Sequence, residues 1–183
     1  MNNKLTLGIL AVLFFGPLVT AYVWFFYFTD VTTGTVNKGD LVDPAVQVSS
    51  LAEAAGAPAA FNGQWAIVHV VRDGCQSDCQ QSVFLTRQVW TRLNKDASRV
   101  QRYVLLEGDA DMPVFEQEHR DLEVMRADAK TINQAFEGIP VGRIYLVDPN
   151  GFLMMSYPQP LVPDDLFDDL RRLMKYSKTG EVQ

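Results

Sequence analysis

Apolar side chains form one uninterrupted block near the N-terminus and then recur in short runs along the rest of the chain. Residues 5–28 contain no charged side chain. As a helix, these 24 residues would span about 36 Å, enough to cross a hydrocarbon core of about 30 Å. The pattern therefore predicts a transmembrane anchor over residues 1–28.

The charges beside this apolar block predict its orientation. Lys4 precedes the block, and the first charge after it is Asp30. Because cytoplasmic flanks carry an excess of Lys and Arg, we expect the N-terminus in the cytoplasm of a bacterium and the rest of the chain on the periplasmic side of the inner membrane. A cleaved signal peptide is the competing interpretation. It would have a shorter apolar region and a small-residue cleavage site, which the sequence after the block lacks.

The next stretch is polar. Residues 29–43 are rich in turn formers and predict a periplasmic tether. We place one folded domain over residues 44–177 and a short tail over residues 178–183. Within the domain, residues 44–48 are suited to an edge strand, and residues 49–64 to a short helix and a loop.

From Trp65 onward, apolar runs of strand character alternate with helical patterns. Residues 65–71 are a continuous apolar run rich in β-branched side chains, as in a strand buried on both faces. Further strands are expected over residues 99–108, 122–127, 143–148 and 151–157, and helices over about 75–94, 112–120, 128–136 and from Pro163 onward. This order predicts an α/β fold with helices packed on a central sheet, whose chemistry collects at the carboxyl ends of the strands.

The charge of the chain excludes some functions. Without Lys4, 15 basic residues stand against 22 acidic residues, a net charge of −7. No run of Lys and Arg could track a phosphate backbone, so we expect no nucleic-acid partner. The sequence also lacks a Gly-rich phosphate loop, a G-x-S-x-G elbow and an H-E-x-x-H motif, and enzyme classes that depend on them are not supported.

The two cysteines of the chain, Cys75 and Cys79, follow the first strong strand. If a helix begins near Cys75, both sulfurs lie on one face, with α-carbons about 6 Å apart, which a disulfide can close. The same two thiolates could hold one soft ion such as Cu(I). A disulfide would close a loop of about five residues and stabilise the fold little. Redox or metal chemistry is therefore preferred over an inert disulfide or incidental thiols.

The anchor, the C-x3-C pair opening a helix and the late motif Tyr145-Leu146-Val147-Asp148-Pro149-Asn150-Gly151 together resemble the SCO family. That family consists of thioredoxin-fold proteins that help to load copper into the CuA centre of cytochrome c oxidase. The resemblance covers roughly residues 30–177. It implies a thioredoxin-like domain, with a central mixed sheet flanked by helices, and cytochrome c oxidase subunit II or its copper chaperones as partners. Residues 37–44 also resemble the tether of small membrane proteins associated with haem-copper oxidase assembly.

Two positions depart from the SCO pattern. Gln80 stands where SCO proteins usually have Pro, and residues 137–142 contain no His where their third copper ligand is expected. Ile139-Pro140 instead resembles the cis-proline segment of thioredoxin-like oxidoreductases. We therefore expect a cis bond at this position, with Pro140 packed against the cysteines.

Few other side chains could complete a copper site. His69 lies in the apolar strand and is expected to be a core histidine. His119 is placed on a solvated helix end. Met154 and Met155 have soft sulfur atoms, but a Met in a hairpin strand usually serves packing. The third ligand of a copper site with Cys75 and Cys79 is therefore unknown.

The sequence predicts a membrane-anchored protein that assists assembly of the CuA centre by thiol–disulfide exchange at Cys75 and Cys79, with Pro140 shaping the docking surface. One thiolate would attack a partner disulfide and the second would resolve the mixed disulfide, which requires no cofactor. Cys75, the N-terminal cysteine, is the usual attacking group in thioredoxin-like proteins. One alternative is a Cu(I)-binding metallochaperone that uses both thiolates. Another is a non-catalytic accessory subunit of a respiratory oxidase.

Overall fold

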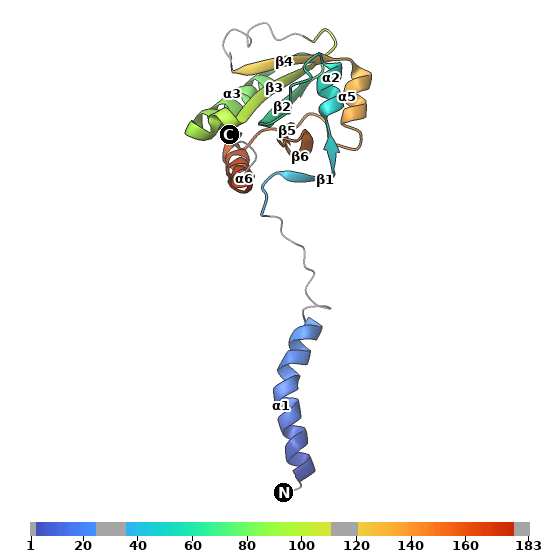
Figure 1. Ribbon diagram of the computed structural model, residues 1–183, viewed down its shortest axis with the longest axis vertical. Helices are drawn as coiled ribbons and strands as arrows, with labels where there is room; N and C mark the ends of the chain where they lie inside the picture. Colours follow the sequence, from blue (N-terminus) through green and yellow to red (C-terminus); the bar gives the residue numbers. More distant parts are fainter. Residues whose placement is uncertain (1–2, 25–35, 111–120, 178–183) are drawn as a thin grey trace. The chain divides into compact units, whose positions relative to one another are not determined.

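The computed structural model describes residues 3–24, 36–110 and 121–177 and divides into two compact units, Met1–Val36 and Asn37–Gln183 (Figure 1). In the first unit, helix α1 (Asn3–Val23) contains Pro17. Its segment Lys4–Val23 has the length and hydropathy of a membrane-spanning helix. This helix fits one crossing of a membrane, as predicted from the apolar block. Residues 25–28, which end that block, lie outside the described residues.

The second unit is built on one six-stranded sheet. Its strands are β1 (Asp40–Gln47), β2 (Trp65–Val71), β3 (Val100–Glu107), β4 (Leu122–Ala127), β5 (Ile144–Val147) and β6 (Phe152–Tyr157). Their spatial order is β1-β6-β5-β2-β3-β4. Strands β2, β3 and β4 are parallel, whereas β5 is antiparallel to β2 and β6 is antiparallel to both β5 and β1. The prediction of a central mixed sheet is confirmed.

Helices cover both faces of this sheet (Figure 1). They are α2 (Ser49–Ala54), α3 (Ser77–Arg92), the 3-10 helix η2 (Asn94–Arg99), α5 (Ala129–Ala135) and α6 (Pro163–Tyr176). Because side chains alternate along a strand, β2 contributes to both faces. Ile67 joins the apolar cluster of Leu166 and Leu170 from α6, whereas Val68 joins the cluster of Ile132 from α5.

The helix starts and the hairpin turn follow local sequence chemistry. The Asp128 carboxylate accepts a hydrogen bond of 2.8 Å from the backbone N–H of Thr131, which caps α5 and lowers the pKa of this exposed carboxyl. Pro163 is the first residue of α6, as predicted. In the turn between β5 and β6, Gly151 has a φ of +81°, a left-handed conformation that glycine adopts without strain.

A buried carboxylate fastens the entry of the chain to α6, and we call this group the entry clamp. Asp169 is fully buried, and its Oδ2 accepts hydrogen bonds from the backbone N–H groups of Lys38 (2.8 Å) and Gly39 (2.9 Å). It also accepts one from the Tyr157 hydroxyl (3.1 Å) and pairs with Arg172. Burial, and next the charge of Asp169, raises the pKa of Tyr157, so this hydroxyl remains a neutral donor.

Candidate functional site

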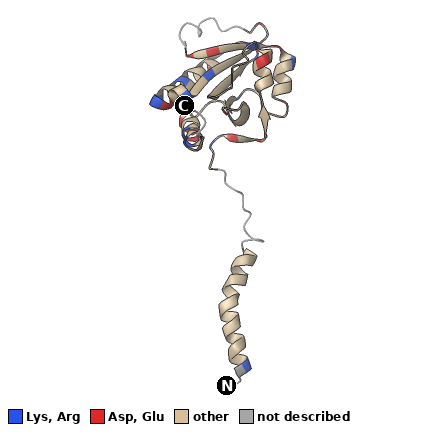
Figure 2. Ribbon diagram, in the orientation of Figure 1, with Lys and Arg blue, Asp and Glu red and all other residues tan. Residues whose placement is uncertain are grey.

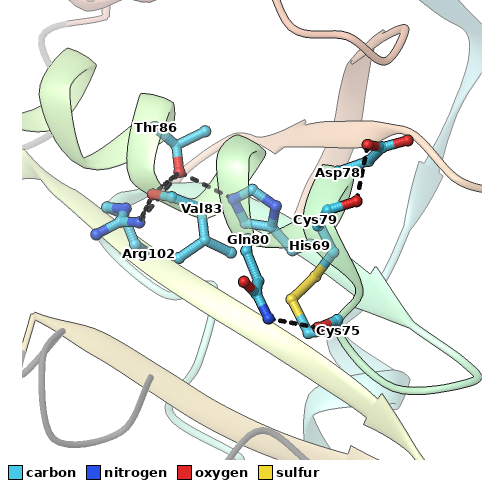
Figure 3. Close-up of a disulfide and its surroundings, with 9 residues drawn as sticks. His69, Cys75, Asp78, Cys79, Gln80, Val83, Thr86 and Arg102 are labelled. Atoms are coloured by element: carbon cyan, nitrogen blue, oxygen red, sulfur yellow. Dashed lines mark hydrogen bonds between the residues drawn. A yellow bond between two sulfur atoms is a disulfide. The ribbon is translucent and has the colours of Figure 1, made fainter. Parts of the chain in front are cut away.

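Cys75 and Cys79 form a disulfide beyond the C-terminal end of β2 (Figure 3). Their α-carbons are 5.2 Å apart, so the predicted disulfide spacing is confirmed. The loop that leaves β2 turns at Gly74, whose φ of +88° is in the left-handed region that favours glycine. This turn allows Cys75 to face the first turn of α3.

Helix α3 begins at Ser77, two residues later than the expected start near Cys75. Gln76 is the N-cap and has an extended backbone, so Cys75 lies in the loop and only Cys79 is helical. The Gln80 side-chain amide donates a hydrogen bond of 3.0 Å to the Cys75 carbonyl oxygen. Gln80, at the position where SCO proteins usually have Pro, therefore ties the loop to the helix across the disulfide.

Both cysteines are half-buried against a small apolar group, which we call the disulfide cluster. It consists of Val71, Val83, Val104 and Leu106, with Ala110, Leu122 and Val124 partly buried beside them. Two exposed carboxylates, Asp73 and Asp78, flank the disulfide, and neither forms an ion pair with any residue that the structure describes. The outer side of the pair is thus acidic, and its inner side is apolar.

A group of buried polar side chains, here called the polar layer, lies between α3 and the sheet (Figure 3). His69 Nε2 lies in hydrogen-bonding distance of Thr86 Oγ1, at 2.9 Å. The Arg102 side chain is fully buried and donates to the Val83 carbonyl oxygen (2.6 Å) and to Thr86 Oγ1 (3.1 Å). Arg102 also pairs with Asp121 at 2.5 Å. The polar layer thus joins β2 and β3 to the helix that carries Cys79.

The two predictions about His69 and the hairpin methionines are confirmed. His69 is 3% exposed, and burial, followed by the charge of Arg102, lowers its pKa to about 3. It is therefore a neutral core histidine. Met154 and Met155 pack in the apolar cluster beneath α6.

No His, Cys, Asp or Glu that could complete a copper site is grouped with the cysteines in the described ranges. Over residues 3–24, 36–110 and 121–177, no three His, Cys, Asp or Glu side chains are grouped so that they could hold a metal ion. His119 lies outside these ranges. The α-carbons of Cys75 and Cys79 are 5.2 Å apart in the disulfide, so only after reduction could this pair offer two thiolates to a soft ion.

Pro140 lies in the loop before β5. Because Ile144 at the start of β5 pairs with His69 near the end of β2, this loop is at the same edge of the sheet as the cysteines. Pro140 is exposed, and its carbonyl oxygen accepts a hydrogen bond of 2.6 Å from the Tyr145 hydroxyl.

The prediction of a cis bond between Ile139 and Pro140 is wrong. Within the described chain, the cis peptide bonds are Asp43–Pro44 and Gln159–Pro160, and Ile139–Pro140 is trans. Most X–Pro bonds in folded proteins are trans, and a match of two residues does not determine the isomer.

Sequence reasoning did not predict the roles of Thr86 and Arg102. A signal for Arg102 was present, because it alternates with Val100 and Val104 along β3 and so points with them to the face that α3 covers. A charged side chain at such a position requires a buried partner. The sequence does not identify that partner, since Thr86, Val83 and Asp121 lie 16 to 19 residues away.

A mixed sheet with helices on both faces and a C-x3-C disulfide after its first parallel strand defines a thioredoxin-like domain. Residues 65–177 match the model of one such family, described as the transmembrane-like, thioredoxin-like, C-terminal domain. This chain belongs to that family. No curated protein matches it.

Solved structures of similar fold include two SCO proteins, in agreement with the resemblance found in the sequence. Yeast Sco1 with copper bound has a TM-score of 0.53 and 15% identity, covering 67% of this chain and 85% of that chain. ScoI of Arabidopsis thaliana with copper bound has a TM-score of 0.53 and 13% identity, covering 63% and 88%. An uncharacterised thioredoxin-like protein from Porphyromonas gingivalis has a TM-score of 0.50 and 16% identity, covering 63% and 78%. At these identities the likeness establishes the shared fold.

Proposed function

We propose that this protein assists assembly of the CuA centre of cytochrome c oxidase by thiol–disulfide exchange at Cys75 and Cys79. The observation that carries the proposal is the half-buried disulfide at the carboxyl edge of the sheet, between residues only four apart. Such a bond closes too small a loop to stabilise the fold much. It also lies where α/β proteins perform their chemistry. The oxidase as target rests on the resemblance of the cysteine pair and residues 145–151 to the SCO family.

In the proposed reaction the reduced protein transfers two electrons to a disulfide of its partner. The Cys75 thiolate attacks one partner sulfur, forming a mixed disulfide while the other partner sulfur leaves as a thiolate. The Cys79 thiolate then attacks Cys75 Sγ, restores the disulfide and releases the second partner thiolate. Cys75 is the proposed attacking group because it lies in the loop before α3, whereas Cys79 is part of the helix.

The proposed setting is the bacterial inner membrane, with the N-terminus cytoplasmic and the thioredoxin-like domain periplasmic. The charges of Lys4 and Asp30 on either side of the apolar block support this orientation. The proposed organisation is an anchor over residues 1–28, a tether that follows it and a domain that ends at residue 177. The domain begins earlier than the expected residue 44, because β1 starts at Asp40 and Lys38 and Gly39 are bound to Asp169. Pro140, exposed at the edge of the sheet where the cysteines lie, contributes to the proposed docking surface.

The test uses the full-length protein in lipid nanodiscs and the CuA domain of subunit II with its cysteine pair oxidised. We expect the reduced protein to reduce this substrate, with a potential near that of thioredoxin, about −270 mV. Cys75→Ser should abolish the reaction, and Cys79→Ser should trap the mixed disulfide. Ser77→Ala, a change between the cysteines, is the matched control. A pair that cannot be reduced without unfolding the domain would contradict the proposal. Association with the oxidase that survives removal of both cysteines would favour an accessory subunit.

Delivery of Cu(I) as cargo is the second candidate function. It is favoured by the 5.2 Å between the cysteine α-carbons, which allows both thiolates of the reduced pair to ligate one soft ion. Titration of Cu(I) against a competing chelator separates the two functions. Tight one-to-one binding that is lost on oxidation would favour the copper carrier, and weak binding would favour exchange.

A further inference from the structure

An apolar groove, here called the β1 groove, lies between strand β1 and the loop before β5. Its volume is about 390 Å³. The apolar residues that line it are Leu41, Val42, Pro44, Val46, Ile139 and Pro140. Leu41 is 47% exposed, so an apolar surface is available to a ligand. The groove is therefore a place where an apolar side chain could be removed from water.

The start of β1, which lines the groove, lies level with the carboxyl end of β2, and the disulfide lies just beyond that end. Ser156 pairs with Asp40 of β1 on one side and with Tyr145 of β5 on the other. The preceding residue of β5, Ile144, pairs with His69 of β2, the strand that leads to Cys75. Three strand spacings of about 4.8 Å separate β1 from β2, or about 14 Å. An extended peptide rises about 3.3 Å per residue, so about four residues span the distance between these strands, and the disulfide lies further on, beyond the end of β2.

The rim of the groove is acidic. Asp40, Asp43 and Glu137 line it, and acidic residues of β1 appear red in Figure 2. Asp40 pairs with Arg143, but Asp43 and Glu137 form no ion pair with another residue described by the structure. An apolar floor with unpaired carboxylates at its rim complements an apolar side chain flanked by cations. The carboxylates of Asp73 and Asp78 beside the disulfide extend this acidic edge.

We propose that the β1 groove determines which partner segments react at the disulfide. It takes an apolar side chain that lies four or more residues from the partner's reactive cysteine and is flanked by Lys or Arg. Burial of the apolar side chain provides affinity, and the charges speed association and position the segment. This inference rests on the exchange reaction proposed above, because it assigns the recognition of the partner to a surface of the same domain.

The binding experiment uses the full-length protein in lipid nanodiscs and fluorescent nonapeptides. In the reference peptide, Ser replaces the reactive cysteine and a Leu flanked by Lys lies four residues away, so binding is measured without exchange. Replacing the Leu by Ser should weaken binding by about tenfold, and replacing both Lys by Glu should weaken it by a similar factor. Fluorescence anisotropy gives the Kd. Equal affinity for the three peptides would overturn the inference.

Two variants of the groove and one control localise the effect. Leu41→Glu and Glu137→Lys should each remove most of the preference for the reference peptide. Glu123→Lys makes the same charge change at an exposed position of β4, which is the outermost strand on the side of the sheet away from β1. This control variant should keep the preference for the reference peptide. If Leu41→Glu does not fold, Glu137→Lys in the exposed loop still decides the matter. A preference that survives in the groove variants would overturn the inference.

Reaction of the wild-type protein with oxidised glutathione separates this inference from the proposed function. Normal exchange together with equal peptide affinities would reject the groove and leave the function standing. Selective peptide binding without any exchange would reject the function and leave the β1 groove as a peptide-binding site.

Discussion

Two buried charges hold helices to the same face of the sheet, and they differ in what they fasten. In the entry clamp, Asp169 of α6 accepts hydrogen bonds from the backbone of Lys38 and Gly39. In the polar layer, Arg102 of β3 donates to Val83 and Thr86 of α3. The first fixes where the chain enters the domain, and the second fixes the helix that carries Cys79. We infer that the clamp serves mainly stability, whereas the polar layer also influences the disulfide.

The largest expected effect follows from removing the centre of the entry clamp. Asp169→Ala leaves two backbone N–H groups, the Tyr157 hydroxyl and Arg172 without their acceptor, so the free energy of unfolding should fall by about 3–5 kcal/mol. The reduction potential of the disulfide should not change. Urea denaturation in detergent micelles and redox titration measure the two quantities. Tyr157→Phe, which removes only one donor, should cost about 1 kcal/mol. A shift in potential for Asp169→Ala would remove the distinction between the two centres.

Disrupting the polar layer should cost less stability than disrupting the entry clamp, and it should also change the reduction potential of the disulfide. Arg102→Met keeps most of the side-chain volume but releases the α3 carbonyl and the partly exposed Asp121, at a cost of about 1–3 kcal/mol. Loss of a positive charge near the cysteines should disfavour the thiolates and make the potential more negative, by about 10–30 mV. Arg87→Met is the matched control, since Arg87 also contacts Asp121 but lies on the exposed side of α3. An unchanged potential for Arg102→Met would show that the polar layer serves stability alone.

Between pH 7 and 5.5, the smallest of these effects is the pH dependence of stability that the polar layer adds through His69. Its pKa in the folded protein is about 3, below the ordinary value of 6.5, so only the unfolded chain takes up a proton between these values. His69 therefore makes stability fall as the pH drops below about 6.5, by about 1.4 kcal/mol for each pH unit, until about pH 3. Between pH 7 and 5.5, wild type should lose about 1.2 kcal/mol more than His69→Gln in urea denaturation. Equal losses would mean that His69 takes up its proton in the folded state.

Elements with a clear local period could be predicted from the sequence. Strand β2, the hairpin around Asp148 and helix α6 appear where the apolar runs and turn residues indicated. The spacing of Cys75 and Cys79 was also correctly judged to permit a disulfide, although α3 begins at Ser77. In each case the information lies within a few neighbouring residues, which is why the sequence alone was sufficient.

Features that depend on distant partners could not be predicted. Asp169 is one of four aspartates in the first half of α6 and resembles the solvated acids beside it. Its burial is decided by Tyr157 and by Lys38, 131 residues away. The β1 groove likewise requires β1 and the loop at Pro140 to meet, and these segments are adjacent only in the folded sheet.

The entry clamp also has a mechanical consequence. A pulling force applied at Asn37 first reaches the two hydrogen bonds from Lys38 and Gly39 to the middle of α6, before it reaches the ladder between β1 and β6. The force is then shared between a helix and an edge strand, and β2 lies three strands further along the sheet. Tension along the chain would therefore act on α6 and β1 at one side of the domain, and the geometry around the disulfide would not change.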